Sequence, residues 1–303
     1  MASLDELVKR KIALFDSIPE ALATKAERAQ LEAWEKVLPI IEELDTDSSG
    51  NITQSEDNIR RIGIIAETLN TELAGGEYRE AVKDFLGSID KGVQLTNEIA
   101  QTFEKGFEPT NAQRQLLKIT QQNAINAFFG AGLRERVTQP FLEQLTANIA
   151  ARAPLREAVK ALKTQVVGDA NLDGKLLSNV KTTAYTAQAV ADRSYSATVN
   201  EDIGIEWFRY AGGEIETTRP FCDHRNGQIF HRKEIEAWGN GQNSGGINDI
   251  RDGKWAGQIE GTDSKSIFTF VGGWNCRHNL MPVNPNRVPE TVKARARAEG
   301  YID

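Results

Sequence analysis

The sequence contains little cysteine or histidine, with two cysteines and three histidines among 303 residues. Two cysteines are too few for the disulfide framework of a small secreted domain, and a chain of this length can bury enough apolar surface to fold without one. No apolar run approaches the length of a membrane span, and the first residues lack the basic and apolar regions of a signal peptide. These absences predict a protein made in a reducing cytoplasm, with no membrane partner.

The sequence also has no excess of positive charge. Lysine and arginine number 36 against 43 aspartates and glutamates, which gives a formal net charge of -7. A protein that coats nucleic acid is normally basic, so bulk contact with DNA is not expected to be the main source of affinity. Lys293, Arg295 and Arg297, on the last expected helix, form a small basic surface that can make a few phosphate contacts.

Apolar residues recur at helical spacing over the first 200 residues, as in Leu31, Trp34, Leu38 and Ile41. Breaks are predicted where glycine and proline gather, at Gly75-Gly76, Gly106 to Pro109, Pro154 and Gly168 to Gly174. The pattern predicts several helices packed as a bundle, and the last of them is expected to run from about Leu176 to Thr198.

The composition changes after residue 200, where four of the five tryptophans and 14 of the 25 glycines are found. Strands are expected at 205–210, 228–230 and 266–271, with a short helix at 233–238, a long loop at 239–261 and a final helix from Pro289. The predicted fold class is therefore α+β, with a predominantly helical N-terminal two-thirds followed by a small mixed α/β domain. The expected regions are 1–110, 111–200 and 201–303.

All five cysteine and histidine side chains lie between residues 222 and 278, and in two places a histidine stands two residues after a cysteine. Residues i and i+2 of an extended segment project to the same face, so two facing strands would offer two sulfur and two nitrogen donors. That set suits tetrahedral zinc, and the predicted ligands are Cys222, His224, Cys276 and His278. Packing and hydrogen bonding are the alternative role, because the usual ligand spacing is missing.

Residues 45–56 match the calcium-binding loop of an EF-hand position by position, with Gly50 at the sharp turn and Ile52 at the apolar eighth position. The expected ligands are Asp45, Asp47, Ser49, Asn51, Thr53 and Glu56. Weak calcium binding is predicted, because the one candidate partner loop, which begins at Asp169, has Val180 where a carboxylate is needed. A polar connector between two helices is the alternative.

The last third of the chain also carries a spaced series of arginine, cysteine, glycine and tryptophan motifs. They are Arg219-Pro220-Phe221-Cys222, Gly227, Lys233-Glu234-Ile235, Trp238, Trp255-Ala256-Gly257, Gly272 to His278 and Pro282-Val283. This series, called the signature below, resembles that of phage minor head proteins, the head-morphogenesis family that includes protein F of bacteriophage Mu. The resemblance covers roughly residues 115–283 and leaves out residues 1–110.

The resemblance implies a structural protein of a tailed-phage head that binds portal or major capsid protein, makes at most weak DNA contact and takes no small-molecule substrate. It implies a virion protein that is present in the host cytoplasm during assembly, and it implies no catalytic residues. Two alternatives stay open. One is a metal-dependent hydrolase or nuclease with Asp223 or Glu234 as base beside zinc, and the other is a calcium-binding interaction module built around residues 45–56.

Overall fold

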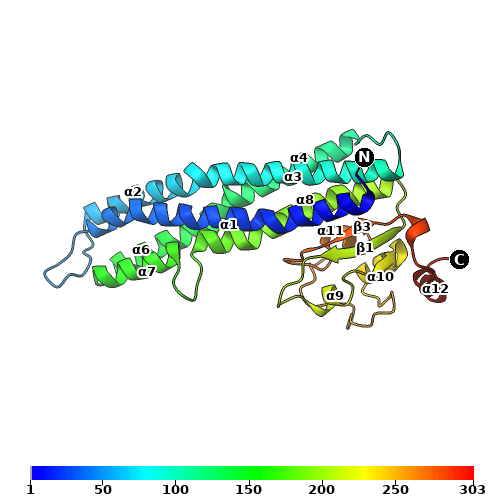
Figure 1. Ribbon diagram of the computed structural model, residues 1–303. Coiled ribbons are helices and arrows are strands. Elements are labelled where there is room, and N and C mark those ends of the chain that lie inside the picture. The colour runs from blue at the N-terminus through cyan, green and yellow to red at the C-terminus, as the bar shows by residue number, and fades with distance from the viewer. Residues whose placement is uncertain (1) are drawn as a thin grey trace. The chain divides into compact units, whose positions relative to one another are not determined.

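The computed structural model describes residues 2–303, and helices make up most of the chain as far as Asp202 (Figure 1). The main helices are α1 (Leu4–Glu42), α2 (Glu56–Ala74), α3 (Gly76–Phe103), α4 (Asn111–Phe128), α6 (Gln139–Ala150), α7 (Leu155–Val167) and α8 (Lys175–Asp202). A short helix α5 (Ala131–Leu133) and a π-helical turn η1 (Arg134–Thr138) separate α4 from α6. The breaks predicted at glycine and proline are confirmed, because Gly75, Gly106 and Pro154 all lie between helices.

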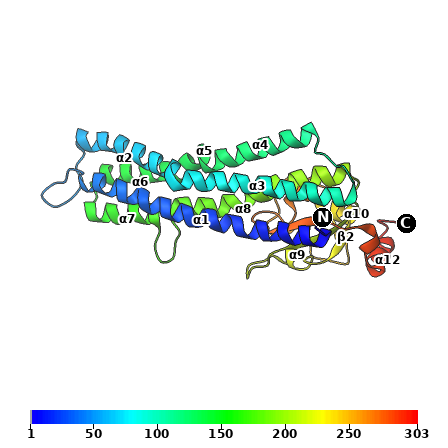
Figure 2. The ribbon, with the colours of Figure 1, turned by 45° about the horizontal axis from the view of Figure 1, so that its top comes forward.

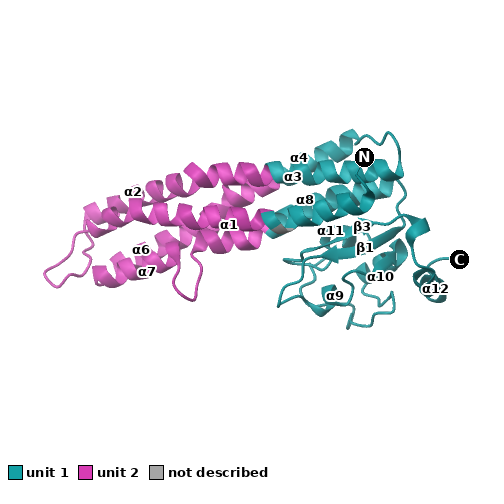
Figure 3. Ribbon diagram, viewed as in Figure 1, with its two compact units in different colours: residues 1–17, 87–121, 185–303 teal, residues 18–86, 122–184 magenta. Residues whose placement is uncertain are grey.

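Internal contacts divide the chain into two compact units (Figure 3). Unit 1 comprises residues 1–17, 87–121 and 185–303, and unit 2 comprises residues 18–86 and 122–184. These units differ from the three consecutive regions 1–110, 111–200 and 201–303 that composition suggested. The difference arises because α1, α3, α4 and α8 are long helices that each contribute residues to both units, and residue 200 lies inside α8.

Unit 2 is predominantly helical, and its helices bury one apolar face each. In α2 the buried apolar residues are Ile65, Leu69 and Leu73, which recur every four residues and so form one stripe. Helix α6 packs against α2 and α7. The rings of Phe85 and Phe128 meet edge to face at 5.3 Å. Unit 2 also contains the loop 45–56.

The helical part of unit 1 brings together segments that are far apart in the sequence. The first part of α1 and the last part of α3 lie side by side, and Leu7 packs with Leu95 and Ile99 (Figures 1 and 2). The second half of α8 packs in the same unit through Tyr195, which belongs to a buried cluster with Val93. Apolar burial between segments of helix therefore supports this end of unit 1.

The rest of unit 1 contains a three-stranded antiparallel sheet of order β2-β1-β3. Its strands are β1 (Trp207–Gly212), β2 (Ile229–His231) and β3 (His278–Pro282), and the elements around it are α9 (Pro220–Asp223), α10 (Arg232–Gly239), α11 (Ile267–Phe270), η2 (Pro285–Arg287) and α12 (Glu290–Ala298). One buried core includes Phe208, Tyr210, Phe221, Phe230, Trp238, Trp255 and Phe268. The α+β fold class predicted from the sequence is confirmed.

One predicted strand is a helix in the structure. Residues 266–271 were expected to be extended because they are rich in Ile, Phe and Val, yet Ile267–Phe270 form α11. Asp263 accounts for the difference, because its Oδ1 accepts hydrogen bonds from the backbone N–H groups of Lys265 and Ser266, at 2.9 and 2.8 Å. These bonds satisfy donors at the start of the helical turn and outweigh the β preference of the sequence.

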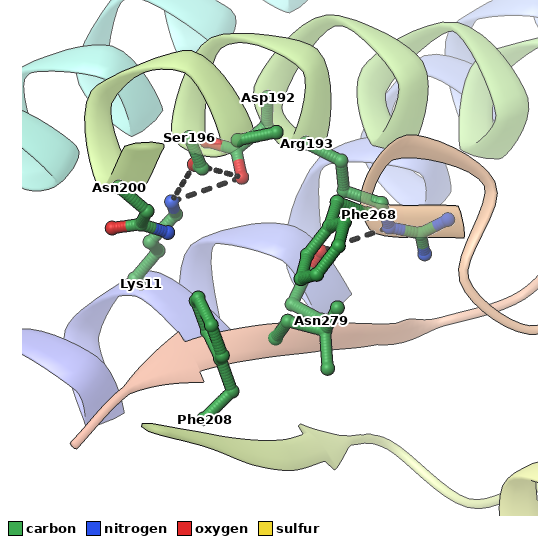
Figure 4. A pocket seen from close by; sticks show the side chains of 10 residues that line it. Lys11, Asp192, Arg193, Ser196, Asn200, Phe208, Phe268 and Asn279 are labelled. Atoms are coloured by element: carbon green, nitrogen blue, oxygen red, sulfur yellow. Dashed lines mark hydrogen bonds and ion pairs between the residues drawn. The ribbon is translucent and has the colours of Figure 1, made fainter. Parts of the chain in front are cut away.

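A buried polar cluster lies between the helices and the sheet of unit 1, and Figure 4 shows Lys11 reaching Ser196 and Asp192. The Lys11 Nζ lies 3.0 Å from Asp192 Oδ2 and donates to Thr96 Oγ1 at 2.7 Å and Ser196 Oγ at 2.8 Å. A cavity of about 10 Å³ adjoins them, which is room for one water molecule. The cluster joins α1, α3 and α8 through an ion pair that is hardly exposed to solvent.

Candidate metal centre

Three of the four predicted zinc ligands come together in the core of unit 1. The donor atoms of Cys222, Cys276 and His278 all lie within 4.8 Å of one another, and the two sulfurs are 3.8 Å apart. All three side chains are buried, and both cysteines are free thiols. Two sulfurs and an imidazole at this separation can hold a metal ion.

Local backbone structure places these ligands. Cys222 lies on α9, which begins at Pro220, a residue suited to the first turn of a helix. Cys276 follows a tight turn in which Gly273 and Asn275 have positive φ values of 95° and 54°. His278 is the first residue of β3, and its backbone N–H donates to Cys276 Sγ at 3.4 Å. A hydrogen bond of this kind favours a negatively charged sulfur.

His224 does not join the other three ligands, which corrects the four-ligand prediction. The prediction assumed that residues 222–224 are extended, whereas Cys222 lies in α9 and His224 ends that helix. Successive residues of a helix turn by about 100°, so positions i and i+2 do not share a face. The exposed His224 ring instead places Nδ1 3.0 Å from Asp249 Oδ2, and Asp249 also forms a bidentate pair with the buried Arg225.

The two thiols have different electrostatic environments. The pKa of the Cys276 thiol lies well below its ordinary value, mainly because Cys222 hydrogen-bonds to its sulfur, and also because the Arg193 guanidinium is near. The pKa of Cys222 is raised by the same hydrogen bond and then by burial. The pair therefore favours one negative sulfur and one neutral thiol, and a metal ion would supply the charge needed for two thiolates.

Two further observations show that the cluster suits a metal. Both ring nitrogens of His278 are buried without a hydrogen-bond partner among the described residues. Buried polar nitrogens are almost always paired, and a bound metal ion would satisfy one of these two. Gly272 leaves space beside the donors, because an added β-carbon would lie 2.3 Å from Cys222 Sγ and 2.9 Å from Cys276 Sγ.

Sequence reasoning missed two neighbours of the cluster. The Tyr210 hydroxyl lies 3.2 Å from Cys222 Sγ, and burial raises the pKa of this phenol well above its ordinary value. Arg193, on α8, donates from Nη2 to the carbonyl oxygen of Cys276 at 2.5 Å and from Nε to Asn279 Oδ1 at 3.0 Å. Neither belongs to a recognisable spacing, because both come from elements distant in the sequence.

The calcium-like loop has part of the EF-hand geometry. Gly50 has a positive φ of 78°, as its position requires, and the buried Ile52 donates its N–H to Ala153 O at 2.9 Å, so residues near Ala153 occupy the place of a partner loop. The expected calcium ligands of this loop are Asp45, Asp47, Ser49, Asn51, Thr53 and Glu56. Among the described residues, the three carboxylates of this set do not form a cluster of metal-ligand dimensions.

Protein groups hold this loop together. The buried Asn58 accepts a hydrogen bond from Asp45 N at 2.8 Å and donates to Asp45 O and Thr53 O, at 3.0 and 2.8 Å. Asp47 Oδ1 accepts from the N–H groups of Ser49 and Asn51, at 2.9 and 3.0 Å, and these bonds lower the Asp47 pKa. Calcium binding therefore stays a prediction.

The small basic surface expected near the C-terminus is largely engaged in ion pairs. Arg295 forms a bidentate pair with the buried Glu234, at 3.0 and 3.1 Å, and Arg297 pairs with Glu290 at 2.6 Å. Fewer cations than the sequence suggested are therefore available on α12 for phosphate contacts. Across the described residues, no helix combines the length and apolar character needed to cross a membrane.

Comparison with protein-family models, with curated proteins and with solved structures finds no match for this chain.

Proposed function

We propose that this chain is a structural protein of a tailed-phage head, of the minor head or head-morphogenesis type, that acts by binding portal or major capsid protein. The observation that carries this proposal is that the signature residues hydrogen-bond to one another and pack against one another within the fold. Arg219 donates to the carbonyl oxygens of Gly272 and Trp274, and the Trp255 Nε1 donates to Gly272 O at 3.3 Å. The Phe221 ring stacks on Trp255 with 4.4 Å between centroids.

The signature glycines have a steric role in the same network. A β-carbon at Gly257 would lie 2.3 Å from Arg219 Nε, and one at Gly273 would lie 1.9 Å from Gly257 O. Side chains at these positions would therefore separate the segments that the signature joins. A signature used in this way maintains a particular fold, which is what a structural component of an assembly requires.

The same geometry argues against the hydrolase alternative. The cavity that Cys276 lines has a volume of about 10 Å³, which suits one water molecule and not a substrate. Glu234, one of the proposed bases, is fully buried and holds Arg295. A catalytic base must reach its substrate, so neither feature favours turnover.

We further propose that Cys222, Cys276 and His278 hold a metal ion and that this ion is zinc. Two sulfurs and an imidazole are soft and borderline donors, which suit zinc better than calcium or magnesium. The surroundings are buried and aromatic, so a bound ion would serve mainly to fasten α9 to β3 and the turn before it. Zinc is therefore proposed as a stabilising component of unit 1.

The signature also presents a large apolar side chain to solvent, where a partner can reach it. The Trp274 side chain is 53% exposed, although its backbone oxygen and N–H are both hydrogen-bonded within unit 1. Exposed tryptophans on a rigid backbone are common anchors of protein interfaces. Trp274 is therefore the proposed anchor for portal or major capsid protein. Binding is proposed to take place during assembly in the host cytoplasm and to persist in the virion. Contact with DNA is proposed to be weak.

The proposal is tested by measuring binding of the purified chain to portal and major capsid protein from a phage that carries this gene. Trp274→Ala is expected to weaken binding at least about 10-fold. Ile215→Ala, which removes another exposed apolar side chain of unit 1 outside the signature, is the matched control and should bind like the wild type. Absence of binding to both partners, or nuclease activity that Cys276→Ser abolishes, would overturn the proposal.

A further inference from the structure

The phenol of Tyr210 lies among the donor atoms of the metal centre. Its oxygen is 3.2 Å from Cys222 Sγ and 3.9 Å from Cys276 Sγ, and the tyrosine is fully buried. These sulfurs are the hydrogen-bond partners that the described residues provide for the hydroxyl. Tyr210 belongs to β1, the central strand of the sheet, so its position is fixed by pairing on both sides.

We infer that Tyr210 Oη is the fourth ligand of the metal, so that zinc is held by two thiolates, one imidazole and one phenolate. This inference rests on the zinc centre proposed above and adds the residue that completes it. On binding, zinc replaces the protons of the phenol and of any protonated thiol, and those protons pass to the solvent.

The separations among the three anionic donors fit a tetrahedron around zinc. With Zn–S bonds of about 2.3 Å, two sulfur ligands stand about 3.8 Å apart, and a sulfur and an oxygen ligand stand about 3.5 Å apart. The observed sulfur–sulfur distance between Cys222 and Cys276 is 3.8 Å, and the two distances from Tyr210 Oη, 3.2 and 3.9 Å, lie on either side of the second value. The two sulfurs and the phenol oxygen therefore need to move by only a few tenths of an ångström. The His278 nitrogen lies within 4.8 Å of the sulfurs and has to approach them further to complete the tetrahedron.

Gly272 keeps the space between these donors open. An added β-carbon there would lie 2.3 Å from Cys222 Sγ, 2.9 Å from Cys276 Sγ and 3.0 Å from Tyr210 Oη. The space that a side chain of residue 272 would fill is therefore bordered by Cys222 Sγ, Cys276 Sγ and Tyr210 Oη, three of the four inferred ligand atoms.

The charge of Arg193 fits an anionic complex. Two thiolates and a phenolate around a divalent cation give a net charge of about -1. Arg193 is 4% exposed, hydrogen-bonds to Cys276 O, and forms no ion pair with a carboxylate among the described residues. Its neighbour Asp192 pairs with Lys11 instead. A buried guanidinium without a counter-ion is costly, so an anionic metal complex next to Arg193 supplies the missing charge.

A closed set of four protein ligands leaves no position for a metal-bound water. This distinguishes a structural zinc site from a catalytic one, which keeps an open position. Coordination by Tyr210 would therefore link β1 to α9 and β3 through the metal ion and stabilise the sheet.

The test uses ultraviolet difference spectroscopy of the purified full-length chain as zinc is added at neutral pH. The wild type is expected to show a tyrosinate band that saturates at about one equivalent of zinc and disappears on chelation. Tyr210→Phe, which removes only the hydroxyl, should lose the band. Tyr195→Phe is the matched control, because Tyr195 is also buried in unit 1 but bonds to Asn97, at 2.8 Å, and its variant should keep the band.

X-ray absorption at the zinc edge of the wild type gives a second measurement that needs no variant. Two sulfur and two lighter ligands are expected, and the tyrosinate band identifies one of these as phenolate, since water gives no such band. Zinc bound at about one equivalent without a tyrosinate band would overturn Tyr210 as a ligand and leave the metal centre intact. Failure of the wild type to bind zinc would overturn both.

Discussion

Gly272→Ala is the smallest change that enters the proposed metal centre. The new β-carbon would approach Cys222 Sγ to 2.3 Å and Cys276 Sγ to 2.9 Å, whereas contacts between nonbonded atoms are favourable only from about 3.5 Å. Gly272 does not have a positive φ, so alanine brings no backbone strain of its own. The effect of the variant therefore reports on the space between the donors.

Two contributions set the expected loss of stability. Overpacking a buried site costs about 1–3 kcal/mol. Loss of a ligand present at about 100 times its Kd removes roughly a further 2.7 kcal/mol. Gly272→Ala is therefore expected to lose about 4–6 kcal/mol in zinc, and only the first contribution should remain in the presence of a chelator.

Denaturant unfolding with zinc and with chelator measures both contributions, and metal analysis gives the bound zinc. Gly87→Ala is the matched control, because Gly87 lies within α3 of the same unit and an added β-carbon there meets no atom within 4 Å. That variant should bind zinc normally and unfold like the wild type or at slightly higher denaturant. Normal zinc binding and stability in Gly272→Ala would refute the steric reasoning.

Four other outcomes are expected. His224→Ala should leave zinc stoichiometry unchanged in metal analysis, because the ring lies outside the ligand cluster; loss of zinc would restore the four-ligand prediction. Calorimetry should detect calcium binding at roughly 10⁻⁵ to 10⁻³ M in the wild type and weaker binding in Glu56→Gln, and flat traces for both would leave the loop as a connector. Burial raises the pKa of Asp249, but hydrogen bonds and the positive charge of its arginine partner outweigh this, so the net pKa is lowered. The Asp249–Arg225 pair therefore stabilises the fold above about pH 4, and this contribution is lost as pH falls through the lowered pKa of Asp249. In acid unfolding of Asp249→Asn, the loss of stability that the wild type shows over this pH range should be absent. Lys11→Met should destabilise the protein by about 3–5 kcal/mol in denaturant unfolding, because Asp192 is left buried and unpaired; a neutral result would mean that the carboxylate is hydrated or protonated.

Periodicity and breaker residues were enough to predict the helical part. Helix α1 contains Leu31, Trp34, Leu38 and Ile41, whose spacing follows the turn of the helix. The predicted stripe is only partly buried, because Trp34 and Ile41 are buried whereas Leu31 is 42% exposed. The helix predicted from about Leu176 to Thr198, the last of the helical part, corresponds to α8, which extends a little further at each end. Local chemistry determines such features, so a single sequence reveals them.

The candidate site was only partly predictable. The sequence brought Cys222, Cys276 and His278 into one hypothesis because cysteine and histidine are rare in this chain. It included His224 wrongly, because whether residues 222–224 are extended or helical depends on Pro220 and on packing around α9. Tyr210 could not be found in this way, since strand pairing between distant segments brings it to the thiols.

The division of unit 1 into three segments bears on the order in which the protein folds during synthesis. Unit 2 lies entirely between residues 18 and 184, so all of its residues have been made before the ribosome reaches the sheet of unit 1. The Lys11 side chain, by contrast, can form its ion pair only after Asp192, which lies 181 residues later in the sequence, has been synthesised. Contacts of such long sequence separation form slowly, and domains tend to fold as units during translation. The nascent chain is therefore expected to carry a folded helical unit while its first helical turns remain without their final partners.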